Sequence, residues 1–319
     1  MNRRDVYLHD LGFALGDTVS TLEDSAARGR LRSRCEDLRQ GGFERHHLAG
    51  PGQNAYHLAR AAVEPMRERA ARASALLYAT CLPGNGNVAE PERYADTRDV
   101  KALMDFPASR LQADLGLEQA LVMGINQQAC TGLLGSLRVA RALLVAEPEL
   151  ESVLCLTSDR FPPGALYEQA YNLISDGAAA CLLSREPGGF RLVASHGLTN
   201  GALAQASDDE TVGSFFAYAS KTISATLTRA RLTPADIDWI VPQNTHGRAW
   251  PVLARLLGLG HARIHDETRA EVGHVISGDN LINLARLRDA GLTRPGQRLL
   301  LFMAGYGLTF QAAILEVVG

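Results

Sequence analysis

One cysteine stands where a chain can expose a nucleophile. In GINQQACTGLLGS, residues 124–136, Cys130 follows polar residues and precedes a segment with helical spacing. A thiol at a helix N-terminus lies near aligned N–H dipoles, which favour the thiolate form that attacks carbonyl carbons. Free cysteine is also among the most buried residue types and often only fills a core. The segment alone leaves both interpretations open.

The remaining cysteines favour a structural role. Cys81, Cys155 and Cys181 lie within the apolar runs YATCLP, VLCLTS and AACLLS, which predicts a place in the core. No short spacing links any two of the five cysteines, so neither a zinc knuckle nor a disulfide framework is indicated.

A metal site is not expected either. His261 and His265 in HARIH are followed directly by Asp266 and Glu267, which superficially matches a ligand cluster. Nothing elsewhere in the chain implies a further ligand, and the segment follows Leu-Gly, so a loop leading to a short strand fits better. We therefore expect neither a metal nor a bound cofactor.

Composition sets broad limits. The chain has 319 residues, 46% hydrophobic and 21% charged, with a formal net charge of −3, which is typical of one large globular domain or two fused halves. The slightly acidic balance and the lack of a basic tract argue against a nucleic-acid partner. We expect no secretory signal in MNRRDVYLHDLGFALGD, no apolar run that spans a membrane, and a cytoplasmic location.

The elements that must position Cys130 follow an α/β pattern. Apolar runs bounded by turn residues alternate with helical spacing. The first half predicts a helix over 132–144, directly after the cysteine, a turn at PGNGN (83–87) beside the site, and buried strands near 74–82, 120–126, 151–157 and 178–184.

The second half repeats this order. It predicts a helix over 212–230, a strand over 237–242 that leads into QNTHGRAW, a loop EVGHVISGDN that opens the helix LINLARLRDAG, and strands at 298–304 and FQAAILEVV. A duplicated core brings equivalent loops together near a pseudo-twofold axis. We place the joint near 186–189, with an N-terminal half, 1–187, that carries the cysteine and a C-terminal half, 188–319, that carries the histidine loops.

Five motifs in this order resemble the thiolase superfamily, specifically its ketoacyl-acyl-carrier-protein synthase III branch. They are ACTGLLGSLRVA, SDGAAACLL, ADIDWIVPQNTHGRAW, GHVISGDN and FMAGYGLTFQAAILE. The resemblance covers essentially the whole chain. It implies a duplicated thiolase-like fold of αβαβα layers with two mixed five-stranded sheets, and a homodimer.

The resemblance also implies covalent acyl transfer through Cys130. In the family, the cysteine takes an acyl group from a thioester of coenzyme A or carrier protein, and a second substrate then attacks the enzyme-bound thioester. The oxyanion of each step would be held by the backbone N–H groups of Cys130 and Tyr306. The family usually carries glycine at the position of Tyr306, and the larger residue would narrow the pocket.

The partner residues depart from the branch. Synthase III enzymes place a histidine after the strand-ending proline and an asparagine after a later glycine, and this pair stabilises the enolate of a decarboxylated malonyl group. Here Gln243 and His274 occupy those positions. His274 instead resembles the histidine in the glycine–histidine loop of thiolases, which serves as a base for the cysteine.

Three nearby residues have more than one interpretation. His246 either faces the pocket or bonds locally at a helix N-terminus. Asp279 either caps the helix that begins near it, which we favour, or orients an imidazole as triad carboxylates do. Arg248 falls where the family contacts the acidic surface of the carrier protein, and a solvated helix arginine is the alternative.

The predicted function is acyl transfer in a specialised biosynthetic pathway. RCEDLRQGGFERHHLAG keeps arginines but lacks the tryptophan that stacks on coenzyme A in the family, which favours acyl carrier protein over acyl-CoA as donor. Loss of the histidine–asparagine pair favours a small hydroxyl or amine acceptor, or a non-decarboxylative condensation. The alternatives are a condensing enzyme that pairs His274 with His246, and a non-catalytic subunit of a condensing heterodimer.

Overall fold

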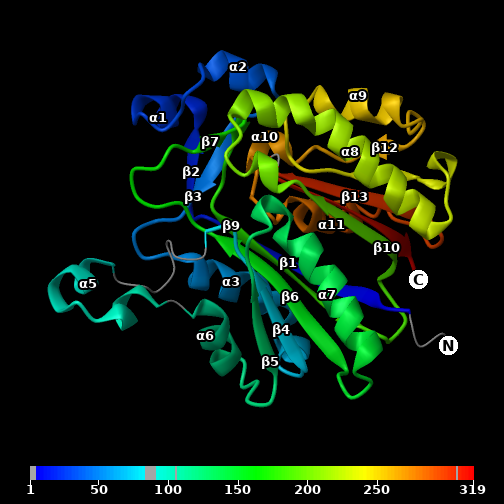
Figure 1. Ribbon diagram of the computed structural model, residues 1–319, viewed down its shortest axis with the longest axis horizontal. Helices are drawn as coiled ribbons and strands as arrows, with labels where there is room; N and C mark the ends of the chain where they lie inside the picture. The colour runs from blue at the N-terminus through cyan, green and yellow to red at the C-terminus, as the bar shows by residue number, and fades with distance from the viewer. Residues whose placement is uncertain (1–4, 83–90, 105, 307) are drawn as a thin grey trace.

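The computed structural model describes residues 5–82, 91–104, 106–306 and 308–319. The predicted PGNGN turn lies outside these residues. Ten strands form the main sheet, in the spatial order β12-β11-β13-β14-β10-β1-β9-β6-β4-β5 (Figure 1). Their bounds are β1 Tyr7–Leu15, β4 Ala75–Ala79, β5 Leu121–Ile125, β6 Ser152–Asp159, β9 Gly177–Ser184, β10 Phe190–Thr199, β11 Trp239–Val241, β12 Arg263–Ile264, β13 Arg298–Gly305 and β14 Thr309–Val317.

The remaining elements cover this sheet or extend from its edges. Two short hairpins pair β2 (Thr18–Thr21) with β3 (Arg45–Leu48) and β7 (Glu168–Gln169) with β8 (Asn172–Leu173). The helices are α1 Leu22–Ala27, α2 Cys35–Gln40, α3 Ala55–Val63, α4 Arg67–Ala70, α5 Pro91–Thr97, α6 Pro107–Asp114, α7 Gly132–Ala146, α8 Asp208–Ala230, α9 Ala249–Leu256, α10 Arg269–Val272 and α11 Asp279–Asp289.

Strand pairing shows that the two halves share one topology. In the first half β4 pairs in parallel with β5 and β6, β6 is antiparallel to β9, and β9 is antiparallel to β1. In the second half β11, β12, β13, β14 and β10 repeat the same pattern. The loop between β5 and α7 is therefore equivalent to the segment between β12 and α11, and these two connections carry Cys130 and His274.

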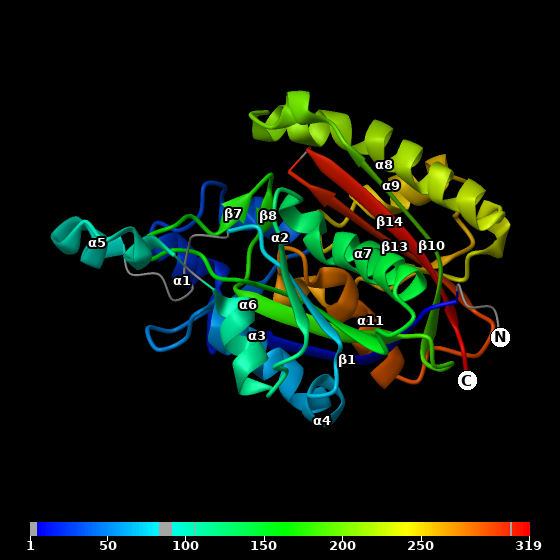
Figure 2. The ribbon, with the colours of Figure 1, turned by 60° about the horizontal axis from the view of Figure 1, so that its bottom comes forward.

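The predicted five-layer arrangement is confirmed (Figure 2). Helices α3 and α6 cover the outer face of the first five strands, and α8 and α9 cover the outer face of the second five. Helices α7 and α11 lie between the two sets of strands, where their apolar side chains form the largest core cluster.

The two sheets are joined rather than separate. Tyr7 and Leu8 of β1 pair with Arg191 and Phe190 of β10, which makes one continuous ten-stranded ladder. The pairing of β1 with β10 is limited to these residues, and the rest of β1 pairs only with β9. The predicted boundary at 187/188 falls in the turn between β9 and β10, where Gly188 and Gly189 both have positive φ.

Helix α7 is a core helix despite its composition. Contrary to the sequence expectation, the segment Ala129–Ala146 is long and apolar enough to cross a membrane. In the folded protein, however, 56% of it is buried. Leu133, Leu137 and Leu144 are almost wholly inaccessible to solvent. Burial between two sheet layers demands an apolar helix, which accounts for the hydropathy without a bilayer.

Candidate active site

A cavity of about 320 Å³ brings together the predicted site residues. Its lining includes the six residues Cys130, Gln243, His246, Arg248, His274 and Tyr306. Asp279 lies behind His274 and is completely buried. Segments from both halves of the chain thus converge on one site, as equivalent loops of a duplicated fold do.

The Cys130 loop is held in an unusual backbone conformation. Cys130 lies in a single 3₁₀ turn, Ala129–Thr131, directly before α7. Gln127 and Ala129 have φ angles of 62° and 43°, a left-handed region that non-glycine residues seldom adopt. Such strain collects at functional sites, where the surrounding structure holds it in place. The loop presents the thiol at the cavity with 8% of the residue exposed.

Gly305 allows β13 to approach the Cys130 amide closely. A Cβ atom at Gly305 would lie 2.9 Å from the Cys130 nitrogen and 2.5 Å from Thr309 Oγ1, so only glycine fits. Tyr306 follows with a φ of 48° and 38% of the residue exposed, and its hydroxyl donates to Asp208 (3.3 Å). The left-handed backbone at Tyr306 explains why glycine suits this position in the resembled family.

The resting Cys130 is a thiol, which corrects the expectation of a thiolate favoured by the helix. A hydrogen bond with the Cys81 side chain raises the pKa of Cys130 well above its usual range, and burial adds to the effect. The negative charges of Asp279 and Asp159 act in the same direction. A base must therefore remove the proton when the substrate is in place.

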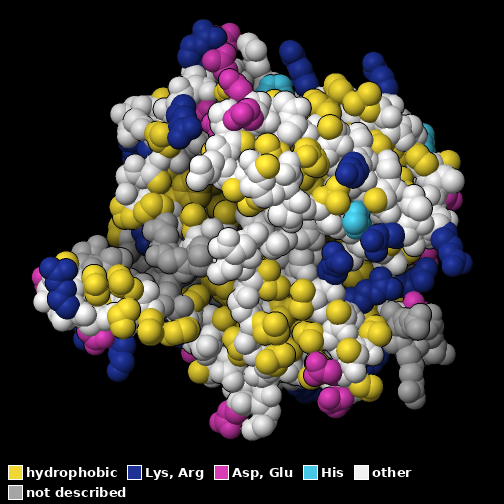
Figure 3. Space-filling view, viewed as in Figure 1, with side chains coloured by type: hydrophobic (Ala, Val, Ile, Leu, Met, Phe, Trp, Pro, Cys, Tyr) yellow, Lys and Arg dark blue, Asp and Glu magenta, His cyan; other side chains and the backbone are white. Residues whose placement is uncertain are grey.

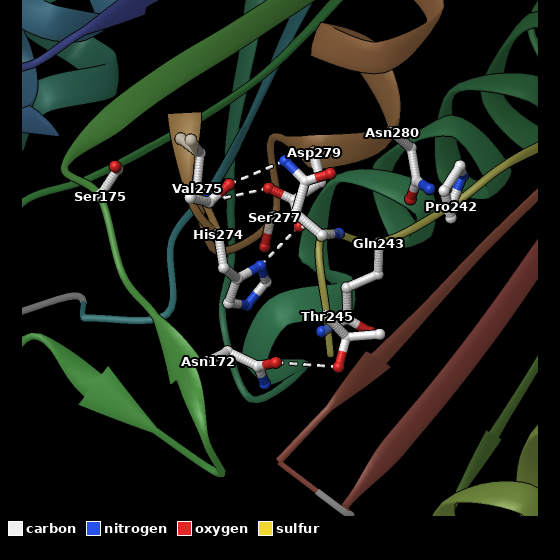
Figure 4. Close-up of polar contacts among 12 residues, drawn as sticks. Asn172, Ser175, Pro242, Gln243, Thr245, His274, Val275, Ser277, Asp279 and Asn280 are labelled. Atoms are coloured by element: carbon white, nitrogen blue, oxygen red, sulfur yellow. Dashed lines mark hydrogen bonds and ion pairs between the residues drawn. The ribbon is translucent and has the colours of Figure 1, made fainter. Parts of the chain in front are cut away.

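His274 lines the same cavity as Cys130, and Figure 4 shows its ring bonded to Asp279. Its Nδ1 lies 2.5 Å from Asp279 Oδ2, and the ring is 3% exposed. Its backbone is fixed on both sides, because His274 N–H donates to Leu173 O (2.8 Å) and Ser175 N–H donates to His274 O (2.9 Å). With Nδ1–H donated to the carboxylate, Nε2 is the nitrogen free to accept a proton.

Asp279 does not cap its helix, so the favoured interpretation was wrong. Its Oδ1 accepts from Val275 N–H (2.7 Å) and its Oδ2 accepts from Asn244 N–H (2.8 Å) as well as from His274. Asp279 is the first helical residue, and its side chain turns back to the segment before the helix. These hydrogen bonds hold the buried carboxylate in place, and the carboxylate in turn holds the imidazole in one orientation.

Gln243 is not a flexible donor in the cavity. Its Nε2 donates to Ala304 O (3.1 Å), and Ala304 N–H donates to its Oε1 (3.0 Å). The oxygen and one N–H of the amide are therefore bound to the backbone at the end of β13, next to Gly305 and Tyr306. Gln243 thus holds the predicted oxyanion segment in place, and its side chain is fixed by both bonds to Ala304.

Three buried asparagines behind the site were not predicted. Asn244 Nδ2 donates to Gly273 O (2.7 Å), Asn280 Nδ2 donates to Val241 O (2.9 Å), and Asn283 Nδ2 donates to Pro242 O (2.9 Å). Together they join the Gln243 loop to the His274 loop. The sequence contained a sign of them. Asn280 directly precedes the helical segment LINLARLRDAG, and Asn283 interrupts its apolar pattern.

His246 and Arg248 lie at the rim of the cavity. Arg248 N–H donates to His246 Nδ1 (3.3 Å), which is the local bond at a helix N-terminus, although the ring also lines the cavity. Burial lowers the pKa of His246, and the positive charges of Arg248 and Arg269 lower it further. Arg248 itself is exposed at the start of α9.

An apolar wall completes the cavity and was not predicted. Helix α8 supplies part of it and α9 another part, and the members are Val212, Phe215, Phe216, Val252 and Phe310. Spacing showed α8 to be a helix, but not which of its residues face a hollow. Among the described residues there is no group of three or more histidine, cysteine or acidic side chains that could hold a metal ion.

Sequence comparison finds similarity to known synthases of the ketoacyl-acyl-carrier-protein synthase III type. Residues 227–317 match the family of the 3-oxoacyl-[acyl-carrier-protein (ACP)] synthase III C terminal. The β-ketoacyl-[acyl-carrier-protein] synthase III of Nitratidesulfovibrio vulgaris is 27% identical over 98% of each chain, and that of Chlamydia caviae is 28% identical over 67% of this chain and 72% of its own.

Solved structures show the same fold over nearly the whole chain. The acyltransferase ChlB3 has a TM-score of 0.81 and 22% identity, and covers 98% of both chains. The 3-oxoacyl-(acyl carrier protein) synthase III of Pseudomonas aeruginosa has a TM-score of 0.78 with 22% identity and the same coverage. The OleA structures of Xanthomonas campestris are also similar, with a TM-score of 0.79 at 14% identity for one bound to cerulenin, covering 99% of both chains.

The duplicated five-layer fold is that of the solved synthase III structures, and residues from both of its halves line the cavity. In sequence, residues 227–317 are similar to the synthase III C-terminal family, and 98% of the chain is similar to a β-ketoacyl-[acyl-carrier-protein] synthase III.

Proposed function

We propose that the protein forms an acyl thioester on Cys130 and passes the acyl group to a small hydroxyl or amine acceptor. The observation that carries this proposal is the His274–Asp279 pair, with the ring nitrogen 2.5 Å from a buried carboxylate. A carboxylate that accepts from Nδ1 makes Nε2 a proton acceptor, which suits base catalysis. Enolate stabilisation requires two neutral donors instead, and the oxygen and one N–H of the Gln243 amide are already bound to Ala304.

The proposed reaction has two balanced halves. First, His274 Nε2 takes the Cys130 proton, the thiolate attacks the donor carbonyl, and the donor thiol leaves with that proton. Second, His274 takes the proton of the acceptor hydroxyl or amine, whose oxygen or nitrogen attacks the thioester, and Cys130 leaves as a thiol. The N–H groups of Cys130 and Tyr306 would hold both oxyanions.

The donor is proposed to be an acyl carrier protein or, less favoured, acyl-CoA. The long apolar wall of α8 suits the arm that carries the acyl group, and exposed Arg248 at the mouth suits an acidic carrier surface. The β-ketoacyl-[acyl-carrier-protein] synthase III relatives, which are named for the acyl carrier protein, support the same donor.

The runner-up is a condensing enzyme that uses His274 together with His246. The contact that favours it is the bond from Arg248 N–H to His246 Nδ1, because a neutral ring that accepts there carries its proton on Nε2 and can donate. The synthase III names of the curated relatives favour it too.

Single-turnover kinetics separate the two. Protein carrying an acyl group on Cys130 is mixed either with small alcohols and amines or with malonyl carrier protein, and loss of the adduct and release of carbon dioxide are followed. Faster discharge by an alcohol or amine supports acyl transfer. Efficient carbon dioxide release with a β-ketoacyl product would replace the first proposal by the second. A protein that never takes up an acyl group would instead fit the non-catalytic subunit.

A homodimer through β5 is part of the proposal. β5 is an edge strand of the described sheet, and Leu121 and Met123 are 43% and 38% exposed. Hydrophobic side chains also gather on the projecting segment that carries α5 (Figure 3), near which Phe106 is 61% exposed. An open apolar edge is a template for pairing with another copy. Sedimentation should give a dimer, and Met123→Asp should give a monomer; a monomeric parent protein would contradict this part.

A further inference from the structure

A second thiol lies against the proposed nucleophile. The side chain of Cys81, which follows β4, interacts with that of Cys130 and is the largest cause of the raised pKa of that thiol. Cys81 was predicted to be a core residue, but it is only half-buried and packs at the edge of the cluster that contains Cys130. The proposed acyl-transfer mechanism gives it no role.

The backbones around the two cysteines are in close contact. Two residues before Cys81 lies Ala79, and two residues after Cys130 lies Gly132. A Cβ atom placed on Gly132 would lie 3.0 Å from Ala79 Cβ, so the end of β4 and the start of α7 approach as closely as glycine permits. The two segments that carry the thiols are therefore packed against each other.

Asp159 fixes the turn that presents Cys81. Its Oδ1 accepts from Thr80 Oγ1 (2.7 Å), Cys81 N–H (2.9 Å) and Leu82 N–H (3.0 Å). Burial raises the pKa of Asp159 to about 7, and the other carboxyl oxygen has no hydrogen-bond partner. Three bonds to one oxygen hold the Cys81 backbone in place beside the nucleophile.

The chain contains a second pair of thiols that serves as an internal comparison. Cys155 of β6 and Cys181 of β9 are direct partners across the antiparallel ladder, and both are 0% exposed. By contrast, Cys130 lines the cavity and is open to small molecules that enter it. The cysteines are neighbours in both pairs, but small molecules can reach a thiol only in the pair that contains Cys130.

We propose that Cys81 and Cys130 are a modification site, at which a small disulfide of a low-molecular-weight thiol oxidises the pair to an intramolecular disulfide. The reaction needs an accessible Cys130 thiol and an adjacent Cys81, and it does not depend on the proposed acyl transfer. While the disulfide exists, Cys130 cannot be acylated, and an acylated Cys130 cannot be oxidised.

Thiol–disulfide exchange accounts for every atom and electron. The Cys130 thiolate, its proton taken by His274, attacks one sulfur of the small disulfide, and one small thiolate leaves. The Cys81 thiolate then attacks the Cys130 sulfur of the mixed disulfide, and the second small thiolate leaves. The two protons go to the two released thiols. Two protein thiols are oxidised and one small disulfide is reduced to two thiols.

Oxidised glutathione and intact-mass spectrometry test the proposal on the full chain without any acyl donor. The protein should lose two hydrogen atoms, and peptide mapping should find Cys81 joined to Cys130. In a second assay, with a donor thioester that acylates the parent protein, oxidation should abolish acylation and dithiothreitol should restore it. Cys81→Ala should keep one glutathione on Cys130, with Cys81→Ser as a second variant in case the first does not fold.

Cys181→Ala is the matched control, because it removes one thiol of the buried pair and should leave the loss of two hydrogen atoms unchanged. A stable glutathione adduct on Cys130 of the parent protein would overturn the proposal, as would a cross-link between Cys155 and Cys181 in place of the expected one. Failure of the proposed function would look different, since the cross-link would form in a protein that no acyl donor modifies.

Discussion

The two halves of the molecule hold equivalent turns by different means. In the first half, the Asp159 carboxylate at the end of β6 binds the backbone of the turn after β4, and this leaves the Cys81 thiol free to contact Cys130. In the second half, the turn after β11 reaches the end of β13 through its own side chain, since Gln243 binds the backbone of Ala304. The same turn therefore leaves the Cys81 thiol free to react in the first half, whereas in the second half the Gln243 side chain is hydrogen-bonded to the backbone.

The nucleophile and the base differ in the same way. Cys130 is held by left-handed backbone at its neighbour Ala129 and by close packing against Gly305. His274 is held by a buried carboxylate that is itself fixed by N–H donors such as that of Asn244. Steric restraint fixes the place of a thiol without favouring its charge, whereas hydrogen bonds to a carboxylate also determine which nitrogen accepts a proton.

The largest expected effect separates the two thiols. Cys130→Ala should abolish the single acyl adduct that intact-mass spectrometry detects, because no other group at the cavity forms the thioester. Cys81→Ala should keep the adduct. An adduct of unchanged yield in Cys130→Ala would show that the nucleophile lies elsewhere.

Removal of the base comes next. His274→Ala should slow discharge of the acyl group to an acceptor by about 100- to 10,000-fold, the range of general base catalysis. Asp279→Asn should also slow it, because an amide can hold the imidazole in the wrong tautomer. Single-turnover rates measure both variants, and circular dichroism checks that they fold. Equal rates in His274→Ala and the parent protein would remove the base from the mechanism.

Breaking the Gln243 bridge should mainly cost stability. Gln243→Ala leaves the N–H and carbonyl of Ala304 buried without their partner, and should lower the free energy of unfolding by about 1–3 kcal/mol. Urea denaturation measures this change. Gln243→Glu keeps the acceptor for Ala304 N–H and loses the donor, so it separates the two bonds. A full catalytic loss without any loss of stability would mean that Gln243 acts on the substrate.

The smallest effect concerns the acidity of the nucleophile. Cys81 is the largest cause of the raised pKa of Cys130, so Cys81→Ala should lower that pKa and leave more thiolate at pH 8. Each unit of decrease gives about tenfold faster alkylation by iodoacetamide below the pKa. In the parent protein the rate should still be rising above pH 9. A plateau near neutrality would show a thiolate already formed at rest.

Some of the fold escaped prediction from the sequence for local reasons. The strands that carry the site were placed correctly because each is a short apolar run bounded by turn residues. β1 was missed because Asp10, with a φ of 43°, interrupts its pattern at a bulge between His9 and Leu11. β10 was missed because the second half of its sequence, SHGLT, does not alternate between apolar and polar residues. These two strands join the halves, so the continuity of the sheet was not visible in the sequence.

Residue types and their order along the chain determined the class of this protein: a cysteine before an apolar helix, a glycine–histidine loop before another, and the same strand order twice. Tertiary structure decided what each side chain does. Capping and orienting are equally compatible with an aspartate in a first helical turn, and only the folded chain places Asp279 against His274. Likewise the contact of Cys81 with Cys130 arises from residues 49 positions apart whose loops meet only after β4 packs on α7. Local sequence fixes backbone preferences over a few residues, whereas the charge, access and partners of a buried group depend on segments distant in the chain.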